Sequence, residues 1–476
     1  MALQQPLLDD PEAQSRSDPA KFEVWREVKM QVVIAGPMIV VGILNFIVPI
    51  SSVMFVGHLG KLSLASASLA SSSCNVTGFI ILMGMSAALE TLCGQAYGAK
   101  QHSLLGVYLQ RAIFVLLLIS IPISILWFYI GDVLRALGQD PLISSHTEEY
   151  ARFLVPGLFG SALVWPSVKF LQAQYVVAPM AIFSLITAIV HVFLCWIFIY
   201  QLHIGAKGAA ICVSISYWLN ALMLLAYIKF SSTCKTTFTG ITKNALHDFR
   251  GFFKLAIPAT VMICFEACSF EILTLLSGLL PNPQLETSSF ASIMSTLVTF
   301  YMIPSGFSAA VSTRVANELG AGNHLVAKSA VGVTLCMAAL NSILSVVVFL
   351  AFRKSIGWVY SNETDVVEHI ASLLKVAFLI AACDPIQCVL GGVVRGCGWQ
   401  AVGALANLTA FYVVGLPTAV VLGFVFKFYG MGLWIGIACG NATQTIILCF
   451  LTFFMNWENQ AKNAHARISR SSLLEE

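Results

Sequence analysis

Long apolar segments separated by short polar ones make up most of this chain. A helix that crosses a bilayer needs about 20 consecutive, mostly apolar residues, and twelve segments reach that length. They cover residues 30–56, 65–95, 104–131, 150–174, 178–201, 205–230, 250–280, 287–317, 326–352, 366–396, 401–426 and 430–455. The pattern therefore predicts an all-α membrane protein with twelve transmembrane helices.

The two halves of the chain repeat each other. Residues 84–102 (GMSAALETLCGQAYGAKQH) return as residues 306–324 (GFSAAVSTRVANELGAGNH), with eight matches in nineteen positions and an offset of 222. The offset is 221 at Pro37 and Pro258, and it rises to 223 and 224 in later spans. Six spans return each copy to the same side of the membrane, so the repeats are parallel. We expect two six-helix lobes related by a pseudo-two-fold axis along the membrane normal.

Two polar tails and one linker complete the division of the chain. The segment before Lys21 and the tail after Trp457 are polar, and we expect both to be disordered or loosely attached. No loop between spans is long enough for a soluble domain, so the spans themselves must carry the function. The expected parts are an N-terminal tail (1–29), a first lobe (30–230), a linker (231–249), a second lobe (250–455) and a C-terminal tail (456–476).

Composition and charge support a membrane protein and indicate its orientation. The chain is 58% hydrophobic and 10% charged, with a mean hydropathy of +0.83, whereas soluble domains are roughly a quarter charged. With the N-terminus in the cytosol, the inner segments hold about seventeen of the 26 Lys and Arg residues, which satisfies the positive-inside rule. Both termini are therefore expected to be cytosolic. No basic cluster indicates a nucleic-acid partner.

The sequence shows no pattern typical of an enzyme, a metal site or a cofactor site. The thirteen cysteines are scattered, mostly in apolar spans, and lack the spacing of metal ligands. Residues 322–329 approach an ATP-binding motif but have alanine in place of its second glycine. An intramembrane aspartyl protease would need two deep aspartates, and only Asp384 lies deep enough. A channel would need rings of charge or a filter loop from several subunits. We expect a monomer without cofactors that is not an enzyme.

Charged residues inside the spans are costly and need a role. Two carboxylates are deep: Glu266 lies near the middle of the seventh span, and Asp384 lies in the middle of the tenth, directly before Pro385. Glu271 is five residues past Glu266 and points to another side of the helix, where it could border a cavity. Capping or pairing between helices at the cytosolic interface accounts for Glu90, Arg314 and Glu318. Three further charges lie near the cytosolic ends of their spans, where Arg395 is expected to anchor the interface; the other two are Arg111 and Lys169.

The two deep acids belong to the second copy alone. Glu266 corresponds to Asn45 in the first copy, and Asp384 corresponds to Ser161. Two carboxylates that share a dry pocket cannot comfortably both be charged, so such a pair can take up a proton and release it when water or a cation arrives. We therefore predict that Glu266 and Asp384 couple proton movement to a change of conformation, with sodium left open. Further candidates to line the cavity are Glu271, Asn45, Ser161, Gln387 and Tyr301.

Four segments resemble the plant DETOXIFICATION-type members of the multidrug and toxic compound extrusion (MATE) transporters. They are VMFVGHLGKL (53–62), ALETLCGQAYGA (88–99), STRVANELGAGN (312–323) and DPIQCVLGGVVRGCGWQ (384–400). The resemblance covers about residues 25–455. It implies two six-helix lobes and a secondary antiporter that expels organic cations, alkaloids, flavonoids or other small organic compounds in exchange for protons or sodium.

The resemblance also implies where the coupling ion binds. In the plant branch the coupling acids belong to the C-terminal lobe, and they map onto Glu266 and Asp384. Many bacterial members carry an aspartate in the first helix, where this chain has Ser51 and Ser52. The expected function is proton-coupled export of small organic molecules by alternating access, in the plasma membrane or the vacuolar membrane. The alternatives are an organic-acid exporter and a sodium-coupled exporter with the same fold.

Overall fold

The computed structural model describes residues 24–473, and almost all of them are helical, with no strand among them. Twelve helices in this part are long and apolar enough to cross a membrane, as predicted. Residues 1–23, which hold most of the predicted N-terminal tail, and residues 474–476 lie outside the described residues.

The first six spans form the first lobe. The second span is divided into α2, a π-helical turn η4, α3 and α4, and the fifth ends in a π-helical turn η5. The elements are α1 (Val24–Gly57), α2 (Lys61–Cys74), η4 (Asn75–Phe79), α3 (Ile80–Ser86), α4 (Ala88–Gly98), α5 (His102–Phe128), α7 (Pro141–Ala173), α8 (Ala178–Cys195), η5 (Trp196–Gln201) and α9 (Ala206–Phe230).

The last six spans form the second lobe, and its fifth span is also interrupted by π-helical turns. The elements are α10 (Phe249–Ser277), α11 (Pro283–Gly320), α12 (His324–Ala351), α14 (Thr364–Cys397), α15 (Gln400–Asn407), η8 (Leu408–Gly415), α16 (Leu416–Val420), η9 (Val421–Val425) and α17 (Tyr429–Phe453). A short helix follows the third span of each lobe, α6 (Ile130–Ala136) and α13 (Arg353–Tyr360). The repeat therefore extends to elements that the apolar segments did not predict.

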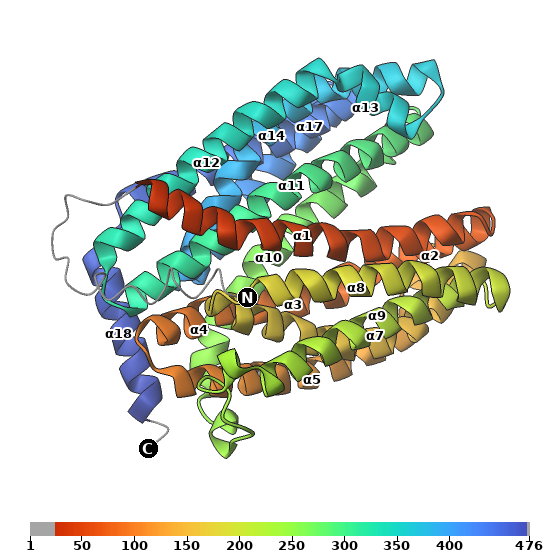
Figure 1. Cartoon of the computed structure of the whole chain (residues 1–476). Helices are drawn as coiled ribbons and strands as arrows, with labels where there is room; N and C mark the ends of the chain where they lie inside the picture. Colours follow the sequence, from red (N-terminus) through yellow and green to blue (C-terminus); the bar gives the residue numbers. More distant parts are fainter. Residues whose placement is uncertain (1–23, 474–476) are drawn as a thin grey trace.

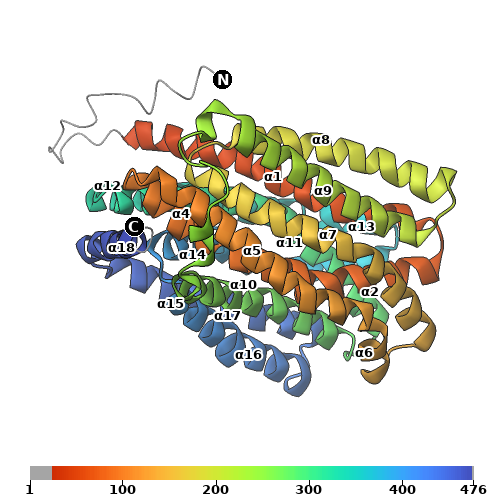
Figure 2. The same cartoon turned by 90° about the horizontal axis from the view of Figure 1, so that it is seen from below.

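The two lobes lie side by side as two bundles with long helices running in the same general direction (Figure 1). Helix α1 of the first lobe packs on α11 of the second, and its counterpart α10 packs on α3 of the first. The start of α1 and the whole of α18 (Trp457–Leu473) lie at one end of the molecule, which we call the terminal face. Figure 2 shows α6 and α13 at the other end, the opposite face.

Helix α18 corrects the prediction that the tail after Trp457 is disordered or loosely attached. Trp457, Ala461, Ala464 and Ile468 are buried, and their spacing places them on one side of a helix. This side packs against α11, α12 and α4 at the terminal face. The prediction was wrong because charged and amide residues between these positions hide a narrow apolar stripe.

The linker between the lobes is ordered and attached to the first lobe. It contains two short 3-10 turns, η6 (Ser232–Cys234) and η7 (Lys243–Leu246). Gln110 and Arg111 of α5 donate side-chain hydrogen bonds to backbone carbonyls of the linker. These bonds satisfy the buried Arg111, which the sequence placed near the cytosolic end of its span.

Candidate functional site

The two deep carboxylates lie together in the second lobe. Glu266 is in the middle of α10 and Asp384 is in the middle of α14. Gln387 joins them, because its Nε2 donates to Glu266 Oε1 at 3.2 Å and to Asp384 Oδ1 at 3.0 Å. Both carboxylates are half-buried and Gln387 is buried. Helix α14 stays continuous through Pro385, so Asp384 and Gln387, three residues apart, lie on one helix face.

Three further amides surround the acid pair. Asn407 Nδ2 lies 3.5 Å from Glu266 Oε2, and Gln444 Nε2 donates to Asn407 Oδ1 at 2.7 Å. Asn441 Nδ2 donates to Asp384 Oδ1 at 3.3 Å. Asn407 ends α15 directly before the π-helical turn η8, and such turns are frequent at functional sites. These amides were not predicted, although each is a buried polar residue in an apolar span.

Neither carboxylate of the pair has a cationic partner among residues 24–473. The ion pairs in this part of the chain involve other carboxylates, whereas Glu266 and Asp384 receive hydrogen bonds from amides. In the same residues no group of three or more His, Cys, Asp and Glu side chains could hold a metal ion. Two neighbouring carboxylates without an ion-pair partner favour a proton or a positively charged ligand.

Two other predicted cavity residues differ in their relation to the acid pair. Tyr301 of α11 lies within electrostatic range of both acids and of Cys388, which follows Asp384 by one helical turn. Glu271 is separate from the pair: Ser72 Oγ of α2 donates to its Oε1 at 3.3 Å. Tyr301 therefore extends the site, while Glu271 forms a contact between the two lobes.

The first-copy counterparts of the acids do not form a second site of the same kind. Asn45 of α1 is half-buried. Ser161 of α7 is fully buried, and its Oγ donates to Leu158 O in its own helix at 2.8 Å. The repeated scaffold is thus present in both lobes, but the paired acids are present in one.

A buried histidine in the first lobe was not predicted. His191 of α8 lies between Ser52 of α1, at 2.9 Å from Nε2, and Ser216 of α9, at 2.8 Å from Nδ1. Because Ser216 Oγ donates to Cys212 O at 2.8 Å, it accepts from Nδ1–H, and Ser52 donates to Nε2. This pattern fits a neutral imidazole that joins three helices. Its position between Val190 and Val192, inside the fifth apolar segment, is the signal in the sequence that a polar residue there needs partners.

Comparison with known proteins places the chain among transporters. A family profile described as MatE matches it twice, over residues 37–197 and 258–421, which reproduces the internal repeat. The chain is 48% identical over 452 residues to Protein DETOXIFICATION 16 of Arabidopsis thaliana, covering 95% of this chain and 93% of that protein. It is 45% identical over 475 residues to Protein DETOXIFICATION 15 of the same plant, covering 100% of this chain and 96% of that protein.

Solved structures agree with the sequence matches. The crystal structure of the eukaryotic MATE transporter AtDTX14 has a TM-score of 0.90 and 42% identity, covering 94% of this chain and 99% of that one. A multidrug resistance MATE family transporter of the MOP superfamily, solved in an outward-facing conformation, has a TM-score of 0.80 and covers 94% of this chain and 97% of that one. Its identity is 17%, so this second likeness shows the fold alone.

Proposed function

Because the chain belongs to the MatE family of multidrug and toxic compound efflux transporters, we propose that it is a proton-coupled antiporter that exports small organic compounds. The proposed substrates are xenobiotics, organic cations, and alkaloid- or flavonoid-like molecules. The protein acts as a monomer in the bilayer and is not an enzyme. The observation that carries the proposal is the acid pair Glu266 and Asp384, bridged by Gln387 and without an ion-pair partner.

The acid pair accounts for exchange because a proton and a cationic substrate compete for the same oxygens. When both carboxylates are charged, they repel each other and attract a cation. When one accepts a proton, the site loses negative charge and holds a cation less strongly. Binding one ligand therefore weakens binding of the other, which is the thermodynamic requirement for coupled exchange.

The excess of Lys and Arg in the inner segments supports a cytosolic terminal face. In that orientation both termini are cytosolic, and the opposite face meets the acidic compartment outside the cell or inside the vacuole. Protons enter from that side and release the substrate there. Deprotonation towards the cytosol then prepares Glu266 and Asp384 for the next substrate.

The test is transport in proteoliposomes under imposed gradients. Glu266→Gln and Asp384→Asn should each reduce export of an organic cation, driven by a proton gradient, to about a tenth of the wild-type rate or less. Glu271→Gln is the matched control: it neutralises a carboxylate on the same helix, outside the pair, and should keep most of the activity.

Wild-type rates in both acid variants under an intact proton gradient would show that the coupling site is elsewhere. Export driven by a sodium gradient alone would support the sodium-coupled alternative. Exchange of organic anions without organic cations would support the organic-acid alternative.

A further inference from the structure

Two corresponding hydrogen bonds join the two copies at the terminal face. Gln95 Nε2 at the end of α4 donates to Gly396 O near the end of α14, at 3.1 Å. Asn317, the counterpart of Gln95, donates from Nδ2 to Ala173 O at the end of α7, at 3.0 Å. Ala173 is in turn the counterpart of Gly396 at the offset of 223. The two bonds are therefore related by the pseudo-two-fold axis.

The helices that carry these amides, α4 and α11, approach closely. A Cβ atom on Gly98 would clash with the backbone of Asn317, and one on Gly320, the counterpart of Gly98, would clash with the backbone of Gln95. Only glycine permits this contact in both copies. The pseudo-two-fold axis thus passes between α4 and α11, and the lobes are joined there.

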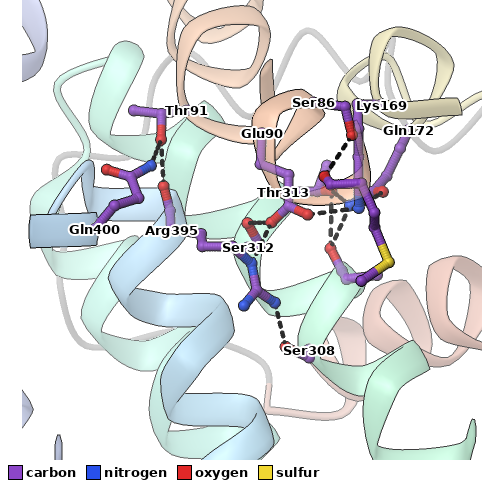
Figure 3. Close-up of polar contacts among 12 residues, drawn as sticks. Ser86, Glu90, Thr91, Lys169, Gln172, Ser308, Ser312, Thr313, Arg395 and Gln400 are labelled. Carbon is purple, nitrogen blue, oxygen red and sulfur yellow. Dashed lines mark hydrogen bonds and ion pairs between the residues drawn. The ribbon is translucent and has the colours of Figure 1, made fainter. Parts of the chain in front are cut away.

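A charged cluster at this axis breaks the symmetry (Figure 3). Glu90 and Ser312 are counterparts in the repeat, and they contact each other: Ser312 Oγ donates to Glu90 Oε2 at 2.6 Å. Glu90 also pairs with Lys169 Nζ at 2.5 Å and with Arg395 Nε at 2.9 Å. At the offset of 223 the counterparts of these two cations are uncharged, Gly392 and Gln172. We call Glu90, Lys169, Ser312 and Arg395 the terminal-face cluster.

The partners of Glu90 are divided between the lobes in a way that matters if the lobes separate. Glu90 and Lys169 belong to α4 and α7 of the first lobe, so their pair survives separation. Arg395 belongs to α14 of the second lobe, where its Nη2 also donates to Ser308 Oγ of α11 at 2.8 Å. Of the contacts that Glu90 makes, separation of the lobes would break those with Arg395 and Ser312 and leave the one with Lys169.

A second ion pair between the lobes has the same organisation. Arg314 of α11 binds Glu27 of α1 with Nε and Nη2, at 3.0 and 2.9 Å. Within α11, Arg314 also binds Glu318 at 2.7 Å, and Glu27 accepts a hydrogen bond from Gln31 Nε2 in α1 at 2.9 Å. Each of these charged groups would keep a partner in its own lobe after separation.

This arrangement avoids a large energetic penalty. The side chain of Glu90 is 3% exposed, and a buried charge that loses all its partners is strongly destabilised. A pair made entirely across the interface would leave Glu90 alone whenever the lobes parted. Lys169 prevents this, so the cluster can open and close without an isolated buried carboxylate.

We propose that the terminal-face cluster is a gate, in which the Glu90–Arg395 pair holds this face closed and Lys169 neutralises Glu90 while the face is open. Arg395 lies on α14, eleven residues after Asp384, which is about 16 Å along a helix. One helix thus carries both a coupling acid and a gate residue. The gate rests on the proposed transport cycle, but its geometry can be measured without substrate or gradient.

If the cluster is a gate, removing Arg395 and removing Lys169 should shift the equilibrium between the closed and open states in opposite directions. Removing Arg395 weakens only the closed state, because Glu90 contacts it only there. Removing Lys169 weakens the open state more, because Glu90 then has no cationic partner. A structural role alone, in which both cations hold one fixed conformation, predicts the same direction for both changes.

The experiment measures distance distributions in the purified full-length protein by pulsed electron spin resonance. Spin labels are attached at Lys100→Cys and Ala321→Cys, two exposed positions that follow α4 and α11, in a background lacking reactive native cysteines. Arg395→Gln should raise the ratio of long to short distances by about tenfold, and Lys169→Met should lower it. Lys207→Met is the control, since Lys207 pairs with Glu149 inside the first lobe, and it should leave the ratio unchanged.

Two further variants complete the test. In a Glu90→Gln background the additional change Arg395→Gln should have little effect, since the pair is already lost. If Arg395→Gln does not fold, Arg395→Lys should shift the ratio in the same direction by a smaller factor. Shifts of the same sign for the Arg395 and Lys169 variants, or no shift in either, would overturn the gate. Neither outcome depends on whether Glu266 and Asp384 couple protons.

Discussion

At the scale of single residues, the acid pair depends on one amide. Gln387 contributes both hydrogen bonds that join Glu266 to Asp384. An amide can bridge two carboxylates because its NH₂ group has two donors. Hydrogen bonds to charged groups contribute about 1.5–3 kcal/mol each, so the bridge sets how closely the two acids stay together.

We predict that Gln387→Ala lowers proton-driven export by about tenfold or more while the protein remains folded. The bridge would be lost, and the carboxylates would separate and hydrate individually. Initial rates in proteoliposomes measure the effect. Thr409→Ala removes a hydroxyl that donates to Leu405 O in the same span and should retain the wild-type rate, and equal rates in the two variants would show that Gln387 is dispensable.

At the scale of helices, α18 connects the two lobes at the terminal face. Arg467 Nη1 donates to Gln95 Oε1 at 2.6 Å in the first lobe, and its Nη2 donates to Cys397 O at 3.3 Å in the second. The apolar side of α18 adds contacts with α11, α12 and α4. Because the apolar side chains of α18 are buried against the lobes, attachment of the helix should depend on keeping that side apolar.

Ala464→Asp should detach α18, since Ala464 is fully buried and an unpaired carboxylate there is costly. Limited proteolysis in detergent should cleave the C-terminal segment roughly tenfold faster than in the wild type. The neighbouring change Asn463→Asp introduces the same charge at an exposed position and should not alter cleavage. Similar cleavage rates for both variants would show that α18 is not held by this side.

The sequence predicts the spans and the acid pair, but it does not predict the three further amides that surround the pair. The twelve spans were predictable because the bilayer imposes a length on apolar segments. The acid pair was predictable because a charge inside a span is rare. Asn407, Asn441 and Gln444 were not identified, because an amide in a span acquires its role only from the helices packed around it. His191 was missed for the same reason.

At the scale of the whole molecule, side-chain contacts join the two lobes at the terminal face. The side-chain hydrogen bonds between Gln95, Asn317, Glu90 and Arg314 and their partners across the lobes all lie there. Transport by alternating access requires these contacts to break and reform in each cycle. In the proposed gate the ion pairs inside each lobe remain intact, so each lobe would move as one body.

A cross-link across the terminal face should therefore stop transport. Joining Lys100→Cys to Ala321→Cys with a short cleavable reagent should reduce exchange by at least about tenfold, and cleavage of the reagent should restore it. Each single-cysteine variant, treated in the same way, controls for modification alone. Undiminished exchange in the cross-linked protein would mean that this face need not open.

The contact between Glu90 and Ser312 depends on the two copies belonging to one chain. In a homodimer of identical six-helix subunits, a residue beside the two-fold axis meets its own copy, so two glutamates would face each other and repel. A single chain with two fused copies escapes this constraint, because positions 90 and 312 can mutate independently. The two copies in one chain therefore allow a single carboxylate at the axis, whereas a symmetric pair of identical subunits would carry it twice.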